Sequence, residues 1–242
     1  MSRKRVLVSW SGGKDSAWAL HLLSQQPEVE VAGLLTTINS QFGRVAMHGF
    51  RQELLEQQAE AAGLPLWPVP LPWPCSNEQY EAAMAAACAR AVTEGIDAIA
   101  FGDLFLEDIR AYREAKLANT GLEPLFPCWQ IPTDRLAHEM IAAGLRAHLV
   151  CVDPRQLDSR FAGRLFDETL LSELPAIVDP CGERGEFHTF VSAGPMFAHG
   201  DVSRSIEVRR GDVVERDGFT YADLLPARSS SHVSHENPAS FR

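Results

Sequence analysis

Residues 11–16, Ser-Gly-Gly-Lys-Asp-Ser, have the side-chain types that bind a chain of phosphates. The two adjacent glycines let the backbone approach an anion closely because no Cβ intervenes. The ammonium of Lys14 adds a positive charge, and the carboxylate of Asp15 is a ligand type that Mg²⁺ prefers. The segment therefore predicts a triphosphate site, with Asp15 as the metal ligand. The predicted binding residues are Ser11, Gly12, Gly13, Lys14, Asp15 and Ser16.

This loop lies between a predicted strand and a predicted helix. Residues 6–8 are apolar and mostly β-branched, and residues 17–23 have helical composition. A helix that begins at the end of the loop presents unpaired backbone N–H groups and the positive end of its dipole to an anion. The alternative is a glycine-rich turn with ordinary surface residues. The position of the loop between strand and helix favours phosphate binding.

Two other motifs do not fit the segment. In a Walker A loop the first glycine would stand where the chain has Val8, and a Ser or Thr would replace Asp15. In the nucleophile elbow of a serine hydrolase, a glycine would replace Ser9. We therefore expect neither a Walker-type kinase nor a serine hydrolase.

Strands alternate with helices through most of the remaining sequence. The predicted strands are residues 29–37, 66–71, 97–101 and 147–152, and the predicted helices are 52–62, 78–92, 107–119 and 133–143. Prolines within residues 65–72 confine that strand to a sheet edge. Repeated β-α-β units imply an α/β fold with a parallel sheet and helices on both faces. We expect this domain to cover residues 1–175.

The pattern changes beyond Pro180. Short alternating segments at residues 187–192, 205–210 and 213–221 predict strands, with turns at Gly211-Asp212 and Asp217-Gly218. We expect a small β-rich C-terminal subdomain over residues 176–226 that forms part of the site. Residues 227–242 are rich in serine and predict a disordered tail.

The SGGKDS segment resembles the hallmark of the PP-loop ATP pyrophosphatases, in which it follows the first strand. Within that superfamily the chain resembles the diphthine-ammonia ligases and their bacterial relatives. The narrower resemblance rests on Gly102-Asp103, RAYRE at 110–114, GLEPLFPCW at 121–129 and, above all, CGERGEFHT at 181–189. Similar features run from about Val6 to about Leu225.

The resemblance implies an adenine nucleotide α-hydrolase (HUP) type, Rossmann-like fold and an ATP-dependent ligase that uses Mg²⁺. Members of the superfamily adenylate a carboxylate or carbonyl oxygen, release pyrophosphate, and let a nucleophile displace AMP. In diphthine-ammonia ligases the carboxylate belongs to diphthine on elongation factor 2, and the nucleophile is ammonia. Diphthamide is confined to archaea and eukaryotes, so a bacterial chain implies another small molecule or protein as acceptor.

Three carboxylates join Lys14 as predicted catalytic residues. Asp103 follows the strand at 97–101, at the sheet end where α/β proteins bind ligands, although Asp is also common at helix caps and turns. Glu183 and Glu186 lie in the glycine-bounded segment that resembles the family signature. They are candidates to bind Mg²⁺ or to accept a proton from ammonium, and solvated turn residues are the alternative.

Two rival functions remain. An RNA-modifying PP-loop enzyme would be expected to carry a CxxC pair and a basic extension, and neither is visible among the five scattered cysteines or elsewhere. A non-catalytic adenine-nucleotide-binding sensor, similar to the universal stress proteins, shares the broad fold. Those sensors typically carry a different glycine-rich motif late in the domain.

Composition narrows the partners and the location. The 242 residues carry a formal net charge of −10, which argues against binding nucleic acid through a wide basic face. The apolar run after the N-terminus is broken by Ser9 and Ser11, and no stretch has the length needed to span a bilayer. We expect a cytoplasmic protein with no membrane contact, and a homodimer is left open.

Overall fold

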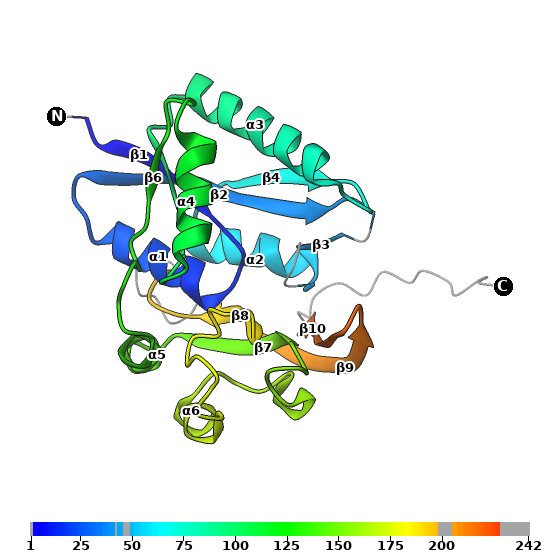
Figure 1. Cartoon of the computed structure of the whole chain (residues 1–242). Helices are drawn as coiled ribbons and strands as arrows, with labels where there is room; N and C mark the ends of the chain where they lie inside the picture. Colours follow the sequence, from blue (N-terminus) through cyan, green and yellow to red (C-terminus); the bar gives the residue numbers. More distant parts are fainter. Residues whose placement is uncertain (1, 42, 46–48, 198–204, 228–242) are drawn as a thin grey trace, which may run out of the picture.

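The computed structural model describes residues 2–41, 43–45, 49–197 and 205–227. It contains two sheets with helices between and around them (Figure 1). Most helices and strands were predicted within a few residues of their observed bounds, and one helix, α2 (Gln52–Ala62), begins and ends at the predicted residues. The predicted α/β class, with a β-rich C-terminal part, is therefore confirmed.

The central sheet is parallel except for one short strand. Its strands are β1 (Lys4–Ser9), β2 (Val29–Asn39), β3 (Arg44–Val45), β4 (Leu66–Leu71), β5 (Ala98–Ala100) and β6 (Glu123–Leu125). The order is β3-β2-β1-β5-β6, with β4 paired to β2, and only β3 runs antiparallel. Among the described residues β4 has a single partner strand, which confirms the edge position predicted from its prolines. The carboxyl ends of β1 and β5 therefore lie side by side.

Helices cover both faces of this sheet. On one face lie α1 (Lys14–Ser24) and α2, and on the other lie α3 (Asn77–Thr93) and α4 (Glu107–Leu117) (Figure 1). Alternate residues of β1 point to opposite faces. Val6 and Val8 pack in the core that contains α1 and α2, whereas Leu7 packs in the core beneath α3.

The second sheet is antiparallel and has the order β8-β7-β10-β9. Its strands are β7 (Arg146–Val152), β8 (Phe187–Ala193), β9 (Val208–Arg216) and β10 (Phe219–Pro226). Helix α1 contacts β8 and α2 contacts β10, so these two helices lie between the sheets. On the outer side lie α5 (Thr133–Ala142), a short 3₁₀ helix η1 (Ser159–Phe161) and α6 (Glu168–Glu173) (Figure 1). This arrangement brings β8 against the start of α1.

Two sequence-based expectations need correction or adjustment. Gly211-Asp212 was predicted to form a turn, but both residues lie inside β9. They face the single residue Asp223 at a shift of register, so the extra residue is taken up by a β-bulge. The turn between β9 and β10 is at Asp217-Gly218, as predicted, and both residues have positive φ (54° and 82°).

The chain passes from the central sheet to the second sheet between β6 and β7, which lies before the domain boundary predicted at 175/176. The reason is β7, which pairs with β8 and β10 rather than with the central sheet. From residue 228 onward, the tail predicted at 227–242 lies outside the described residues.

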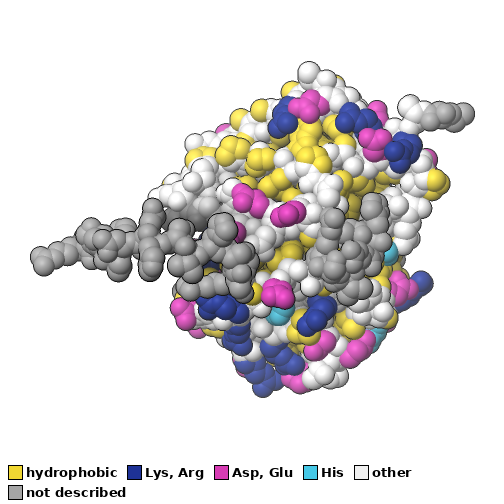
Figure 2. Space-filling view, turned by 180° about the vertical axis from the view of Figure 1, so that it is seen from behind, with side chains coloured by type: hydrophobic (Ala, Val, Ile, Leu, Met, Phe, Trp, Pro, Cys, Tyr) yellow, Lys and Arg dark blue, Asp and Glu magenta, His cyan; other side chains and the backbone are white. Residues whose placement is uncertain are grey.

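On the face in Figure 2, Lys and Arg side chains stand beside Asp and Glu side chains over both halves of the molecule. None of the helices that the structure describes is both long and apolar enough to cross a bilayer. All five cysteines are free thiols, and four of them are buried.

Candidate active site

The loop between β1 and α1 has a conformation that requires glycine. Gly12 has a φ of +76°, and a Cβ there would lie 2.4 Å from the ring of Phe50. The Ser11 hydroxyl accepts a hydrogen bond from the amide of Gly13 at 3.3 Å and lies 3.1 Å from the Ser16 hydroxyl. The Ser16 hydroxyl donates to the Gly13 carbonyl at 3.0 Å. The hydroxyl groups of the two serines therefore hold the loop in this conformation.

The start of α1 is held from two sides. No side chain caps the helix at Gly13, and the amide of Lys14 donates to the Thr189 hydroxyl of β8 at 3.0 Å. From the central sheet, Gly102 approaches so closely that a Cβ would lie 2.7 Å from the Asp15 carbonyl carbon. The glycine at 102 therefore brings the end of β5 against the helix N-terminus, where the dipole favours an anion.

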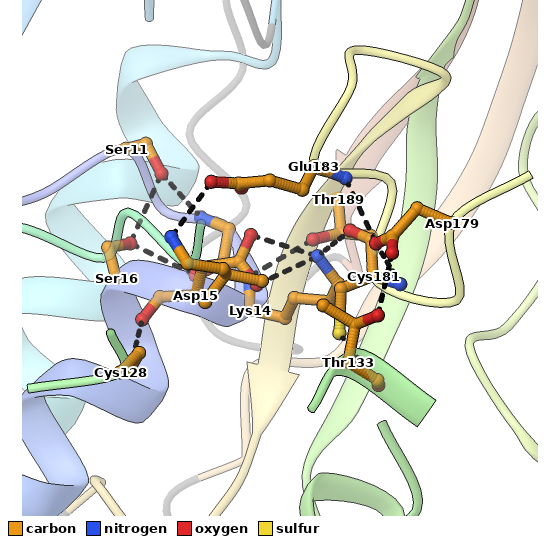
Figure 3. Close-up of polar contacts among 12 residues, drawn as sticks. Ser11, Lys14, Asp15, Ser16, Cys128, Thr133, Asp179, Cys181, Glu183 and Thr189 are labelled. Carbon is orange, nitrogen blue, oxygen red and sulfur yellow. Dashed lines mark hydrogen bonds and ion pairs between the residues drawn. The ribbon is translucent and has the colours of Figure 1, made fainter. Parts of the chain in front are cut away.

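The sequence predicts that the Lys14 ammonium meets phosphate, but the structure buries this side chain inside the protein. Its side chain is 2% exposed, and its ammonium donates to both carboxylate oxygens of Asp15 at 2.9 and 2.8 Å and to the carbonyl of Cys181 (Figure 3). The rings of Phe166 and Phe187 lie 5.8 and 5.5 Å from it. Burial, the largest single influence, lowers the pKa of Lys14, but Asp15, Cys181 and Glu183 together raise it overall. The ammonium is therefore charged and joins the first loop to the segment 181–189.

Asp179 and Glu186 shape the loop that carries the second signature. Asp179 Oδ1 accepts from the amides of Cys181 and Glu183 at 2.9 and 3.3 Å, and its Oδ2 accepts from the Thr133 hydroxyl at 2.6 Å (Figure 3). Glu186 is 2% exposed, and its two oxygens accept from the amides of Asp179 and Arg184, each at 2.9 Å. Carboxylates that accept backbone N–H groups in this way hold a tight turn in place.

Glu183 lies between the two halves of the molecule. Its Oε1 accepts from the amide of Leu104, just after β5, at 2.8 Å. Burial raises the pKa of Glu183 to about 7, and the Asp15 charge adds to the shift while the Leu104 amide and the Lys14 charge oppose it. The carboxyl group therefore exchanges its proton near neutral pH, which suits a general acid or base.

A cavity of about 530 Å³ opens at the carboxyl ends of the central strands. That volume lies in the range typical of sites for small ligands. Among the predicted site residues, Ser11, Asp15, Ser16, Asp103 and Glu183 line it. The strand ends, α3 and β8 add further wall residues, among them Thr36, Thr37, Ser76, Asn77, Tyr80 and His188. Burial lowers the pKa of His188 to about 4, with the Lys14 charge adding to the shift, so its imidazole is neutral at neutral pH.

Neither Lys14 nor Glu186 is a wall residue of the cavity. Lys14 lies beneath the loop, and Glu186 lies within its own turn. The structure thus brings the predicted residues into one region, where some line the cavity and others lie behind its walls. Ser11, Asp15, Ser16, Asp103 and Glu183 face the cavity, while Lys14 and Glu186 support the segments that carry them.

Asp103 is the carboxylate that best fits a metal ion. Its Oδ2 is buried without a hydrogen-bond partner and lies 3.6 Å from Arg113 Nε. Burial raises the pKa of Asp103, the Asp15 charge adds to this, and Arg113 opposes it. Asp15, the predicted ligand, already pairs both oxygens with Lys14 and would have to exchange that partner. Mg²⁺ commonly takes only one or two carboxylates, with phosphate and water completing its shell. The residues present therefore fit Mg²⁺ only together with a bound phosphate chain. Within the described part of the chain, no group of three or more His, Cys, Asp or Glu forms a metal cluster by itself.

Gln58 of α2 has a central place in the site that its sequence context does not reveal. Its side chain is fully buried and accepts from Trp10 Nε1 at 3.0 Å, while its amide donates to the carbonyls of Gly12 and Val191 at 2.9 and 2.8 Å. Val191 also donates its own amide to the Gly12 carbonyl at 3.0 Å. Gln58 thereby ties the phosphate loop to β8. A glutamine in an amphipathic helix gives no such signal, because Gln is common on exposed helix faces.

Comparisons with known proteins match the chain to one family over most of its length. Residues 4–124 match the model described as diphthamide synthase N-terminal domain, and residues 132–214 match the diphthamide synthase C-terminal domain. The join between these two ranges falls before β7, as does the division between the sheets.

Several similar curated proteins carry the name diphthine–ammonia ligase. The bovine protein is 25% identical over 93% of this chain and 90% of its own length. The human protein is 25% identical over 84% of each. The Schizosaccharomyces pombe protein is 25% identical over 80% of this chain but only 35% of its own length.

Proposed function

Since the chain belongs to the diphthamide synthase family, we propose that it is an ATP-dependent, diphthine-ammonia ligase-like enzyme that forms an amide and releases AMP and pyrophosphate. The observation that carries the proposal is the cavity at the carboxyl ends of β1 and β5. The SGGKDS loop, the N-terminus of α1 and a partly buried carboxyl group with a pKa near 7 meet there.

We propose that ATP places its phosphates at the loop 11–16. Ser11 and Ser16 line the cavity, and their hydroxyls are the proposed donors to phosphate oxygens. The N-terminus of α1 adds a dipole that favours negative charge. Mg²⁺, when bound to the phosphates, would neutralise their charge, with Asp103 and Asp15 as the candidate protein ligands.

The proposed chemistry has two steps. First, a carboxylate oxygen of the acceptor attacks the α-phosphorus of ATP, the bond between the α-phosphorus and the bridging oxygen breaks, and pyrophosphate leaves. Second, the nitrogen of ammonia attacks the activated carbonyl carbon, AMP leaves with the electron pair of the C–O bond, and the nitrogen loses one proton. The first step is needed because a free carboxylate resists attack by an amine until its oxygen becomes a leaving group.

Glu183 is the proposed acceptor of that proton. It lines the cavity, and burial raises its pKa to about 7. A base is most effective when its pKa lies near the working pH, because it is then available and still strong enough to take a proton. Its hydrogen bond from the Leu104 amide fixes the carboxylate between the central sheet and the segment 181–189.

We place the acceptor in a neighbouring cavity of about 600 Å³. The two cavities share the wall residues Val45, Leu71 and Cys75. Aromatic side chains from the β4–α3 connection and from β10 also line the second one: Trp73, Phe219 and Tyr221. An acceptor bound there would direct its carboxylate through the shared wall toward the phosphates. In an archaeal or eukaryotic source the proposed acceptor is diphthine on elongation factor 2, and in a bacterial source it is another small molecule or protein.

The experiment that tests this function is product analysis with ATP, Mg²⁺, ammonia and a panel of acceptors that includes diphthine-containing elongation factor 2. Acceptor-dependent formation of AMP and pyrophosphate supports the proposal. ADP and phosphate as the only products would contradict it. ATP binding without turnover in every mixture would favour the nucleotide sensor, and turnover that requires RNA would favour an RNA-modifying PP-loop enzyme.

A further inference from the structure

The positive charge expected to meet ATP at the SGGKDS loop is already neutralised inside the protein. The ammonium of Lys14 has three hydrogen bonds, two to the Asp15 carboxylate and one to the Cys181 carbonyl. It is 2% exposed and is not a wall residue of the cavity. Because Mg²⁺ offsets only part of the charge of a triphosphate, ATP in the cavity still needs a positively charged side chain other than Lys14.

Arg113 of α4 meets this need. Among the described residues that line the 530 Å³ cavity, it is the only Lys or Arg. Asp15, Asp103 and Glu183 line the same cavity, so its walls without a ligand carry more negative than positive groups. Without Arg113, no full positive side-chain charge on those walls would offset the phosphate charges.

The guanidinium of Arg113 is fixed in place but incompletely bonded. It lies over the ring of Phe101, with 4.9 Å from its central carbon to the ring centroid. Its Nε is buried without a hydrogen-bond partner and lies 3.6 Å from Asp103 Oδ2, which is also buried and lacks one. An ion pair at this separation leaves both groups short of a hydrogen bond, and a buried polar group without one is costly.

We propose that Arg113 is the phosphate-binding cation of this site and that ATP binding replaces its long contact with Asp103 by hydrogen bonds to phosphate oxygens. This inference rests on the proposed function, because it assumes that ATP occupies the cavity. The planar guanidinium suits phosphate oxygens, which it can bind through two N–H groups at once. The ring of Phe101 would keep it at the cavity wall in the absence of ligand.

The test compares ATP with adenosine, which has the same base and sugar but no phosphate, by equilibrium dialysis against the purified full chain. For Arg113→Gln we expect affinity for ATP to fall about tenfold to 100-fold, the value of a hydrogen bond to a charged group. Affinity for adenosine should be unchanged. Arg113→Lys, which keeps the charge but loses the planar fork, should fall between Arg113→Gln and the wild type.

Arg110→Gln is the matched control, since Arg110 lies on the same helix, stacks on Phe126 and Trp129, and does not line the cavity. Its ATP affinity should equal that of the wild type. Unchanged ATP affinity in Arg113→Gln would overturn the inference, and so would an equal loss for ATP and adenosine, which would indicate a deformed pocket. If the wild-type protein itself failed to bind ATP, the proposed function would fall, and the inference with it.

Discussion

The Thr189 hydroxyl of β8 accepts a hydrogen bond from the backbone amide of Lys14 at 3.0 Å, although the two residues are 175 positions apart. Lys14 is the first residue of α1, so this bond satisfies one of the amides that a helix N-terminus leaves unpaired. In the same place the Lys14 ammonium donates to the Cys181 carbonyl. The N-terminal phosphate loop and the C-terminal signature therefore form one structural unit, in which each stabilises the other.

Replacing Thr189 with Val should loosen this unit at nearly constant side-chain volume. The Lys14 amide would then be buried against a methyl group, and we expect the free energy of unfolding to fall by about 1–3 kcal/mol. Chemical denaturation measures the change. Thr189→Ser keeps the hydroxyl and serves as the control, with a smaller loss. A Thr189→Val protein as stable as the wild type would show that the hydrogen bond contributes nothing.

Replacing Lys14 with Met tests whether the lysine is structural. Met fills much of the same apolar space beside Phe166 and Phe187, but it leaves the Asp15 carboxylate without its cation. Removing one partner of a buried pair costs about 3–5 kcal/mol, and the partial exposure of Asp15, 29%, places the expected loss below that range. Thermal melting measures it.

The double variant Lys14→Met with Asp15→Asn is the matched control for this prediction. It removes the unpaired charge as well as the cation, so it should recover part of the lost stability. If Lys14→Met kept the wild-type melting temperature and only bound ATP more weakly, Lys14 would instead be a phosphate-binding residue, as the sequence predicts.

The sequence predicts the location of this site better than it predicts the function of each residue in it. SGGKDS predicts a phosphate loop because glycines, hydroxyls and a lysine at a strand–helix junction are typical of anion binding. Whether Lys14 points into a cavity or beneath the loop depends on Cys181 and Phe187, which only folding brings to it. The same holds for Arg113, whose proposed role follows from its place on the cavity wall rather than from its neighbours in the sequence.

The fold shows the same limit. Helix and strand positions follow from local patterns of apolar residues, and these were mostly correct. Local patterns do not reveal to which sheet β7 belongs, because a short apolar strand gives the same pattern in a parallel and an antiparallel sheet. Gly211-Asp212 likewise satisfies the composition of a turn and of a bulge, and the register with β10 decides between them.

Glu186→Gln distinguishes support of a loop from participation in the chemistry. Both oxygens of Glu186 accept backbone amides, so Gln would place its NH₂ group against one of those N–H donors. We expect the free energy of unfolding to fall by about 1–3 kcal/mol. Turnover should also fall, since the loop carries Glu183, but its dependence on pH should not move. A shifted pH profile together with unchanged stability would make Glu186 a catalytic group.

Glu183→Gln gives the most direct test of the proposed base. Only the carboxylate form can accept a proton, so wild-type turnover, referred to the concentration of unprotonated ammonia, should rise with pH through about 7. In Glu183→Gln this rise should vanish, and turnover should fall roughly 10²-fold to 10⁴-fold, the usual contribution of a general base. Binding of ATP should be retained, because the change removes a group that acts in the chemical step.

Stability supplies an independent readout of the same carboxyl group. Burial raises the pKa of Glu183 from 4.5 to about 7, so the folded state binds its proton more tightly than the unfolded state does. This contribution to stability is complete below about pH 4.5 and is lost as the pH rises through about 7. The difference between the denaturation midpoints of the wild type and of Glu183→Gln should therefore change most between about pH 4.5 and about pH 7. Parallel midpoints would show that Glu183 has an ordinary pKa, and an unaltered pH profile of turnover in the variant would remove it from the mechanism.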